Sequence, residues 1–123
     1  MERVIGIGGV FFKARDPKAL AEWYATYLGV PFDNGQTYGT FTAANGDQTV
    51  WSIFPADTTY FAPSQSGFMI NFRVRDLKAM LAQLRDAGLP VDERVEEYEY
   101  GNFGWVVDPE GNRIELWEPK QPF

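Results

Sequence analysis

The chain has 123 residues, of which 45% are hydrophobic and 16% aromatic, and 17 acidic residues against 11 basic ones give a net charge of −6. This length and composition predict one compact domain and exclude a disordered chain. Because phosphate binding depends on clustered Lys and Arg, and no basic run occurs, nucleic acid is not an expected partner.

The amino-acid usage also limits the chemistry and the location. The apolar runs are shorter than the roughly 20 residues of a membrane span, so no membrane partner is expected. The chain contains no cysteine and no histidine. Without cysteine and without a signal-peptide pattern at its start, the sequence fits a cytoplasmic protein. Without histidine, Ser-His-Asp and Cys-His nucleophile systems are excluded.

The first part of the chain reads as a strand, a helix and a hairpin. Residues 4–14 are rich in Val, Ile and Phe, which predicts a strand. Asp16-Pro17 supplies an N-cap and a proline at the first helical position, and apolar residues at helical spacing follow up to Gly29. Asn45-Gly46 separates two segments of strand character, YGTFTAA and QTVWSIF, and predicts a hairpin between them.

The second part repeats this plan. A strand over residues 68–75 is followed by Asp76 as the cap of a helix that ends near Gly88. Three further strands are expected near 94–99, 103–107 and 113–118, with Asp108-Pro109-Glu110-Gly111 as the last turn.

The repetition is visible in the letters themselves. VFFKARDPKA at residues 10–19 returns as INFRVRDLKA at residues 70–79. Internal repeats fix the architecture, and we expect an α+β fold of two tandem βαβββ modules, residues 1–60 and 61–123, within a single domain. Each module alone would leave one sheet face bare, at a cost of about 25 cal/mol per Å² of apolar surface. The modules are therefore expected to pair around a shared cavity.

A ferredoxin-like βαββαβ domain is the alternative fold. It has two helices and the same repeat symmetry. It leaves the strands near 49–54 and 113–118 without places, and for that reason the paired modules are preferred.

Strand alternation predicts which side chains point into the cavity. Apolar residues at every second position of each strand are assigned to the helix side, and the intervening residues then face the cavity. Aromatic side chains there would give flat apolar walls, and polar ones would give specific contacts. The expected ligand-binding residues are Phe11, Lys13, Trp51, Met69, Asn71, Arg73, Trp105, Glu115 and Trp117.

Two segments carry a family resemblance. DPEGNRIEL at residues 108–116 and RDPKALAEWYATYLGV at residues 15–30 resemble the glyoxalase/bleomycin-resistance/ring-cleaving dioxygenase group, the vicinal oxygen chelate (VOC) superfamily. The resemblance covers nearly the whole chain. It implies the paired-module fold and a homodimer.

The resemblance also implies where a metal would be held. Metal-dependent members place four ligands on one divalent ion, and the corresponding positions here are Gly9, Met69, Val50 or Trp51, and Glu115. Only Glu115 is a potential ligand, whereas a divalent site needs about three or four N, O or S donors. We therefore expect no metal and no cofactor.

Metal-free members of the superfamily bind drugs such as bleomycin or mitomycin with aromatic side chains. The resemblance implies that this chain binds a small aromatic or heterocyclic molecule without a metal. One alternative is a metal-independent lyase or isomerase, in which Glu115 moves a proton while Lys13 or Arg73 holds an oxyanion. The other alternative is an interaction or regulatory module whose cavity is filled by side chains.

Overall fold

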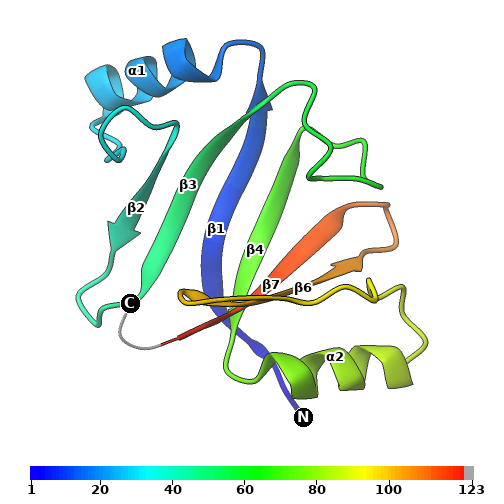
Figure 1. Cartoon of the computed structure of the whole chain (residues 1–123). Helices are drawn as coiled ribbons and strands as arrows, with labels where there is room; N and C mark the ends of the chain where they lie inside the picture. Colours follow the sequence, from blue (N-terminus) through cyan, green and yellow to red (C-terminus); the bar gives the residue numbers. More distant parts are fainter. Residues whose placement is uncertain (121–123) are drawn as a thin grey trace.

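The structure, a computed structural model, describes residues 1–120. It consists of one seven-stranded sheet that curls into a half-barrel, with one helix beside each half (Figure 1). The strand order is β2-β3-β1-β4-β7-β6-β5. The elements of the first half are β1 (Val4–Ala14), α1 (Pro17–Leu28), β2 (Tyr38–Thr42) and β3 (Gln48–Pro55). Those of the second half are β4 (Phe68–Val74), α2 (Leu77–Asp86), β5 (Glu96–Tyr98), β6 (Gly101–Val107) and β7 (Arg113–Pro119).

The predicted α+β fold of two related halves is confirmed, with one difference. The first half has three strands and the second has four, because residues 29–37, which follow α1, contain no strand. The end of the second module, residues 121–123, lies outside the described part of the chain.

The two halves meet at β1 and β4, the strands that carry the repeated sequence. These strands pair antiparallel, with Val10 opposite Ile70 and Phe12 opposite Phe68. β3 lies parallel to β1 on one side, and β7 lies parallel to β4 on the other. The two strands for which a ferredoxin-like fold has no place, β3 and β7, therefore each lie between two other strands of the sheet, which excludes that alternative.

Equivalent caps begin both helices. Asp16 Oδ1 accepts a hydrogen bond from the backbone N–H of Ala19 at 3.1 Å, and Asp76 Oδ1 accepts one from Ala79 at 3.0 Å. Such caps satisfy backbone donors that have no partner inside the helix. The residues that are identical in the two copies of the repeat thus include the two helix caps. Each cap starts its helix at the same distance after the preceding strand.

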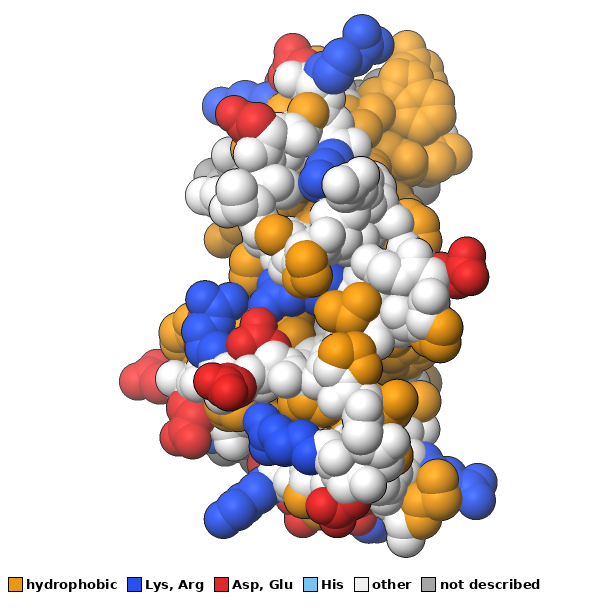
Figure 2. All heavy atoms as spheres, turned by 90° about the vertical axis from the view of Figure 1, so that its right-hand side faces the viewer, with side chains coloured by type: hydrophobic (Ala, Val, Ile, Leu, Met, Phe, Trp, Pro, Cys, Tyr) orange, Lys and Arg blue, Asp and Glu red, His pale blue; other side chains and the backbone are white. Residues whose placement is uncertain are grey.

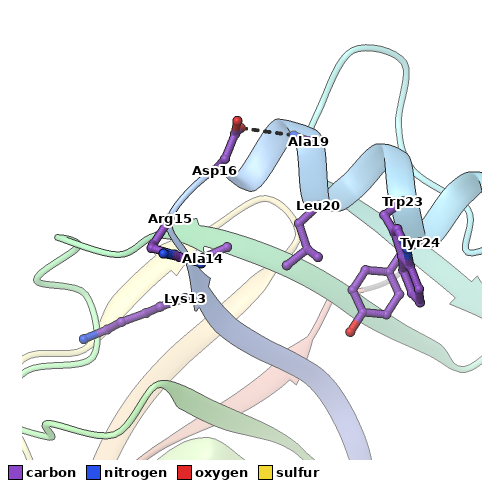
Figure 3. Close-up of a pocket in the computed structure, with 8 residues that line it drawn as sticks. All are labelled: Lys13, Ala14, Arg15, Asp16, Ala19, Leu20, Trp23 and Tyr24. Carbon is purple, nitrogen blue, oxygen red and sulfur yellow. Dashed lines mark hydrogen bonds between the residues drawn. The ribbon is translucent and has the colours of Figure 1, made fainter.

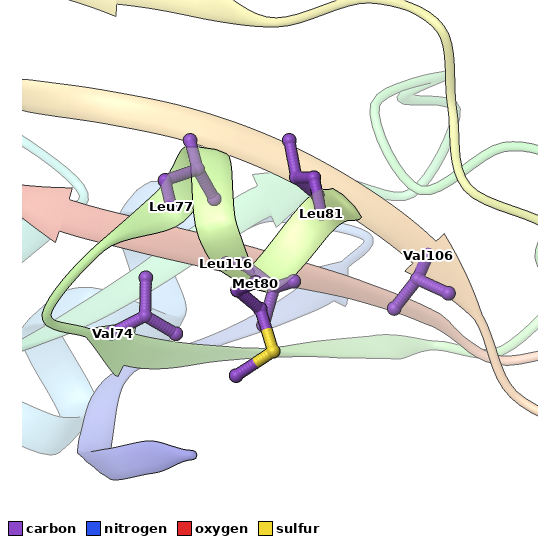
Figure 4. Close-up of a cluster of buried hydrophobic side chains, with 6 residues drawn as sticks. All are labelled: Val74, Leu77, Met80, Leu81, Val106 and Leu116. Atoms are coloured by element: carbon purple, nitrogen blue, oxygen red, sulfur yellow. The ribbon is translucent and has the colours of Figure 1, made fainter. Parts of the chain in front are cut away.

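The main apolar core lies between α2 and the sheet (Figure 4). At Gly104 of β6 the helix side chains lie against the strand backbone, since a Cβ atom there would be 3.0 Å from Leu81 Cδ1. The absence of a side chain at this position lets the helix lie against the strand. The buried side chains of this core are Val74, Leu77, Met80, Leu81, Val106 and Leu116.

Helix α1 packs on the other half of the sheet through three aromatic rings. Trp51 of β3 contacts Phe12 of β1 and Tyr24 of α1, with ring centroids 5.2 and 5.4 Å apart. Edge-on contacts of this kind add to the stability gained by burial. The Trp51 side chain therefore lies on the helix side of the sheet, and the prediction that it faces the cavity is wrong.

The DPEGN segment forms the turn between β6 and β7. Asp108 Oδ1 accepts hydrogen bonds from the backbone N–H groups of Glu110 and Asn112, both at 2.9 Å. Asn112 Oδ1 in turn accepts a hydrogen bond from the Ser66 hydroxyl at 2.5 Å. The segment therefore sets the turn and ties it to the connection between the halves.

On the face seen in Figure 2, acidic and basic side chains are interspersed. Within residues 1–120, no helix is both long and apolar enough to cross a membrane.

Candidate functional site

A pocket of about 240 Å³ lies on the concave side of the sheet. Both halves contribute to it, since Phe11 belongs to β1 and Trp117 to β7. The cavity is thus formed within one chain. Its lining residues are Gly8, Phe11, Val50, Phe54, Tyr60, Asn71, Tyr100, Phe103, Glu115 and Trp117.

The pocket floor follows a row of residues across the four central strands. Gly9 of β1 lies opposite Val50 of β3 on one side and opposite Asn71 of β4 on the other. Asn71 lies opposite Glu115 of β7. Residues in such a row project to the same face of a sheet, which brings Asn71 and Glu115 together at the boundary of the two halves.

An irregularity in β1 brings another glycine to the floor. The β1–β4 register shifts between Ile7 and Gly9, so Gly8 is an extra residue on β1. A Cβ atom on Gly8 would lie 2.2 Å from Asn71 Oδ1 and 2.8 Å from Trp117 Cε3. Glycine at this position therefore allows both side chains to lie against the backbone of β1.

Glu115 is the centre of a buried hydrogen-bond network. This residue is only 1% exposed. Asn71 Nδ2 donates to Oε1 at 2.6 Å, and Trp105 Nε1 donates to Oε2 at 2.9 Å. The Tyr60 hydroxyl also donates to Oε2. Three donors on three different segments thus hold the carboxyl group in one orientation.

Burial has the largest effect on the pKa values of Glu115 and Tyr60 in this network. It raises the pKa of Glu115, and the hydrogen bonds from Tyr60, Asn71 and Trp105 oppose that rise only in part. Burial also raises the pKa of Tyr60, and the negative charge of Glu115 raises it further. Tyr60 therefore remains a neutral donor throughout the physiological pH range.

Arg113 stabilises the segment that carries Tyr60. Its guanidinium donates to the Tyr60 backbone oxygen at 2.5 Å and pairs with Asp92 at 3.2 Å. It also lies over the Trp105 ring, 4.6 Å from the centroid. Glu115 itself makes no ion pair within residues 1–120.

Each half supplies an aromatic wall. In the first half, Phe54 stacks on Tyr60 at 5.6 Å and contacts Phe11 at 5.6 Å. In the second half, Phe103 stacks on Trp117 at 6.0 Å and contacts Tyr100 at 5.8 Å. The rings within each wall support one another, so the walls are set before any ligand arrives.

The structure brings four of the nine predicted site residues to the pocket. These are Phe11, Asn71, Glu115 and Trp117. Met69 and Trp105 lie on the same side of the sheet but belong to a buried cluster with Phe11 and Phe61. Trp105 acts on the site through Glu115, whereas Met69 only packs against the cluster.

The two predicted basic residues, Lys13 and Arg73, lie outside this pocket. Lys13 Nζ is 5.4 Å from the Phe61 ring centroid, and Lys13 borders a wider hollow of about 930 Å³ beside the start of α1 (Figure 3). Arg73 donates to the backbone oxygens of Ile7 and Gln48, at 3.0 and 2.5 Å. Neither cation is placed to hold an oxyanion beside Glu115.

Six lining residues were not predicted. Val50 and Phe54 follow from the alternation of β3 once its register with β1 is known. Tyr60 lies in the connection between β3 and β4, where no periodic pattern marks it. The remaining three are Gly8, Tyr100 and Phe103.

Comparison with known proteins supports the assignment of the fold. A family model described as a glyoxalase-like domain matches residues 9–117. The chain belongs to the glyoxalase-like domain family. It is thus a member of the glyoxalase/bleomycin resistance/dioxygenase superfamily, as its sequence motifs predict. No curated protein sequence matches the chain.

Solved structures share the fold of this glyoxalase-like domain. Methylmalonyl-CoA epimerase from Mycobacterium tuberculosis is 21% identical, with a TM-score of 0.67 over 95% of this chain and 89% of that one. A Streptomyces coelicolor epimerase variant in complex with 2-nitronate-propionyl-CoA is 16% identical, with a TM-score of 0.68 over 95% and 99%. A superfamily member from Vibrio splendidus 12B01 is 15% identical, with a TM-score of 0.61 over 96% and 99%.

The residues present do not fit the divalent metal site of the superfamily. The row across the central strands contains Gly9, Val50, Asn71 and Glu115. Asn71, not Met69 as expected, is the neighbour of Glu115 in this row. Within residues 1–120, no group of three or more His, Cys, Asp or Glu side chains could hold a metal ion. One carboxylate and one amide fall short of the donors that a divalent ion needs.

Proposed function

We propose that this glyoxalase-like domain binds a small aromatic or heterocyclic molecule between its halves, without a metal ion. The observation that carries the proposal is the pair of aromatic walls above a floor with one carboxyl group. Ligand pockets are typically apolar with a few fixed polar groups. Phe54 and Tyr60 on one side, and Phe103 and Trp117 on the other, meet that description.

The network around Glu115 supports binding without a metal. Its carboxyl group accepts hydrogen bonds from Asn71, Trp105 and Tyr60. These groups point hydrogen atoms toward the carboxyl group, whereas a metal ion is bound by lone pairs. A metal ion at this position would have to break at least part of the network. Leaving those donors buried without partners would cost about 1–3 kcal/mol for each.

The proposal is tested with protein that has been dialysed against EDTA. We expect one- and two-ring aromatic compounds to raise the melting temperature, since a ligand that binds only the native state stabilises it. Addition of zinc, manganese or nickel should not be required for this shift. If no aromatic compound raised the melting temperature unless a metal was present, the proposal would be wrong.

A second candidate function is metal-independent proton transfer by Glu115. The raised pKa of this buried carboxyl group favours it, because a general acid or base works best with a pKa near the working pH. Lys13 and Arg73 do not line the pocket, and the Tyr60 hydroxyl already donates to Glu115, so the oxyanion partners expected from the sequence are not at the site. Turnover of small carbonyl compounds that survives Glu115→Gln would exclude this candidate.

The filled-cavity alternative has less support. A pocket of about 240 Å³ is too large to count as a packed core, which leaves few voids larger than a water molecule.

We propose also that the chain forms a homodimer through the helix side of the sheet. Three apolar residues on this face are close to half exposed: Val4, Ile7 and Phe68. They share the face with the residues opposite them on the neighbouring strand, which are Val74, Phe72 and Phe12. Exposed apolar residues gathered on one face mark interaction sites. Light scattering after size-exclusion chromatography should show a dimer that Ile7→Lys converts to a monomer; a wild-type monomer would contradict this.

A further inference from the structure

We propose that the ligand of this pocket is a cation: a one- or two-ring aromatic amidine, amine or protonated nitrogen heterocycle whose N–H groups point toward Glu115. This inference rests on the proposed function and names the class of ligand for the same site.

The charge of the lining is the first argument. Among the described residues that line the pocket, Glu115 is the one with an acidic or basic side chain. Arg113, whose positive charge acts on Glu115 without an ion pair, is itself paired with Asp92 and lies over the Trp105 ring. Within residues 1–120, the carboxyl group of the pocket therefore has no ion-pair partner.

The cost of burying that carboxyl group is the second argument. An ionised carboxylate in an apolar site is expensive unless it is paired as well as hydrogen-bonded. Glu115 has hydrogen-bond donors from Asn71, Trp105 and Tyr60 but no ion pair within residues 1–120. A cationic ligand supplies the missing partner, whereas an anionic one adds a second negative charge.

Asn71 gives independent support. Its side chain is 1% exposed, and its Oδ1 has no hydrogen-bond partner in the described part of the chain. This oxygen lies toward Gly8, another lining residue, where a Cβ atom would be 2.2 Å away. An unpaired acceptor beside the Glu115 carboxyl group makes the floor more negative, and no donor within residues 1–120 bonds to this oxygen.

The aromatic walls favour the same class of ligand. The face of an aromatic ring carries negative potential, so a cation near Tyr60 or Trp117 is attracted to it. A planar ring can also stack on the same faces. The net charge of −6 adds a long-range attraction for cations and a repulsion for anions.

The volume limits the size of the ligand. The pocket holds about 240 Å³, which is below the roughly 300–1,000 Å³ of sites for drug-sized molecules. One ring or two fused rings match that space.

The test is calorimetric titration of metal-free protein at pH 7.5 with two matched series of probes. These are benzamidine, benzamide and benzoate, and the corresponding 2-naphthyl compounds. Members of a series share their ring and differ in charge. We expect each amidine to bind roughly 10- to 100-fold more tightly than its amide, since a hydrogen bond to a charged group is stronger than one between neutral groups. The carboxylates should bind more weakly than the amides.

Glu115→Gln removes the charge and keeps the shape of the side chain. In this variant the ratio of amide to amidine dissociation constants should fall to within about threefold of one. Glu22→Gln, at an exposed position of α1, removes the same charge from the surface and should leave the ratio high. An unchanged ratio in Glu115→Gln would overturn the assignment to this carboxylate.

The outcomes separate the two proposals. If the amides bind wild-type protein as tightly as the amidines, the cation inference is wrong and the proposed function remains. If no member of either series binds, the proposed function fails as well. These wild-type measurements decide the matter even if Glu115→Gln does not fold.

Discussion

Asn71 Nδ2 donates a hydrogen bond to Glu115 Oε1 at 2.6 Å, between residues that lie directly opposite each other on β4 and β7. Both residues are buried. The contact fixes the orientation of the carboxyl group, because Trp105 and Tyr60 hold only its other oxygen. Asn71 is therefore a positioning residue for Glu115.

Asn71→Leu should destabilise the protein by about 1–3 kcal/mol, because Glu115 Oε1 loses its donor in a buried site. Urea unfolding at pH 7.5 measures the change. The control is Asn34→Leu at an exposed turn, where a change within about 0.5 kcal/mol is expected. Equal effects of the two substitutions would show that the buried hydrogen bond contributes nothing.

Gly8→Ala should destabilise the protein by about 1–3 kcal/mol, as overpacking of a tight site does. The new methyl group would lie 2.2 Å from Asn71 Oδ1 and 2.8 Å from Trp117 Cε3, so one of them must move. Gly67→Ala is the matched control, since nothing lies within 4 Å of a Cβ atom there. Thermal unfolding of both variants should show a loss at residue 8 only; the reverse order would contradict the close approach at β1.

The pH dependence of stability should reveal the buried carboxyl group. Burial raises the pKa of Glu115 above its ordinary value of 4.5, so the folded state keeps this proton at a pH where the unfolded state has lost it. The wild-type free energy of unfolding therefore falls, by up to about 1.4 kcal/mol per pH unit, from pH 4.5 up to the raised pKa.

Glu115→Gln has no such proton. The stability of this variant relative to wild type should rise with pH above 4.5 and then level off. Urea unfolding at several pH values between 4.5 and 8 provides the comparison. Parallel profiles for the two proteins would mean that Glu115 ionises as freely in the folded state as in the unfolded one.

Tryptophan fluorescence should distinguish the two sides of the sheet. Trp117 lines the pocket, whereas Trp51 packs between Phe12 and Tyr24 on the helix side. Titration with benzamidine should change the emission of wild type and of Trp51→Phe by similar amounts. Trp117→Phe should lose most of that change. A response that depends on Trp51 would place the ligand elsewhere.

The helices and most strand boundaries could be predicted because short-range chemistry sets them. Asp16 and Asp76 cap the two helices as expected, and Gly29 ends the first helix with a positive φ of 68°. Asn71 and Glu115 were placed on the cavity side by alternation alone. The internal repeat indicated that β1 and β4 are equivalent, and these strands form the centre of the sheet.

The positions of Trp51 and Tyr60 depend on long-range contacts that local sequence patterns do not reveal. Alternation along the sequence predicts Trp51 in the cavity, but the parallel register of β3 with β1 pairs Trp51 with Val10 and Val50 with Gly9, and this register depends on the tertiary fold. Tyr60 was missed because its position is set by Arg113, 53 residues further along the chain. Alternation says nothing about a side chain carried by a connection.

The binding mode can be observed in a crystal structure of EDTA-treated protein soaked with benzamidine. We expect the ring in the pocket lined by Phe54 and Trp117, the amidinium near Glu115, and no anomalous signal from a metal at that carboxylate. A divalent ion bound to Glu115, or a ligand bound elsewhere while this pocket stays empty, would contradict this binding mode.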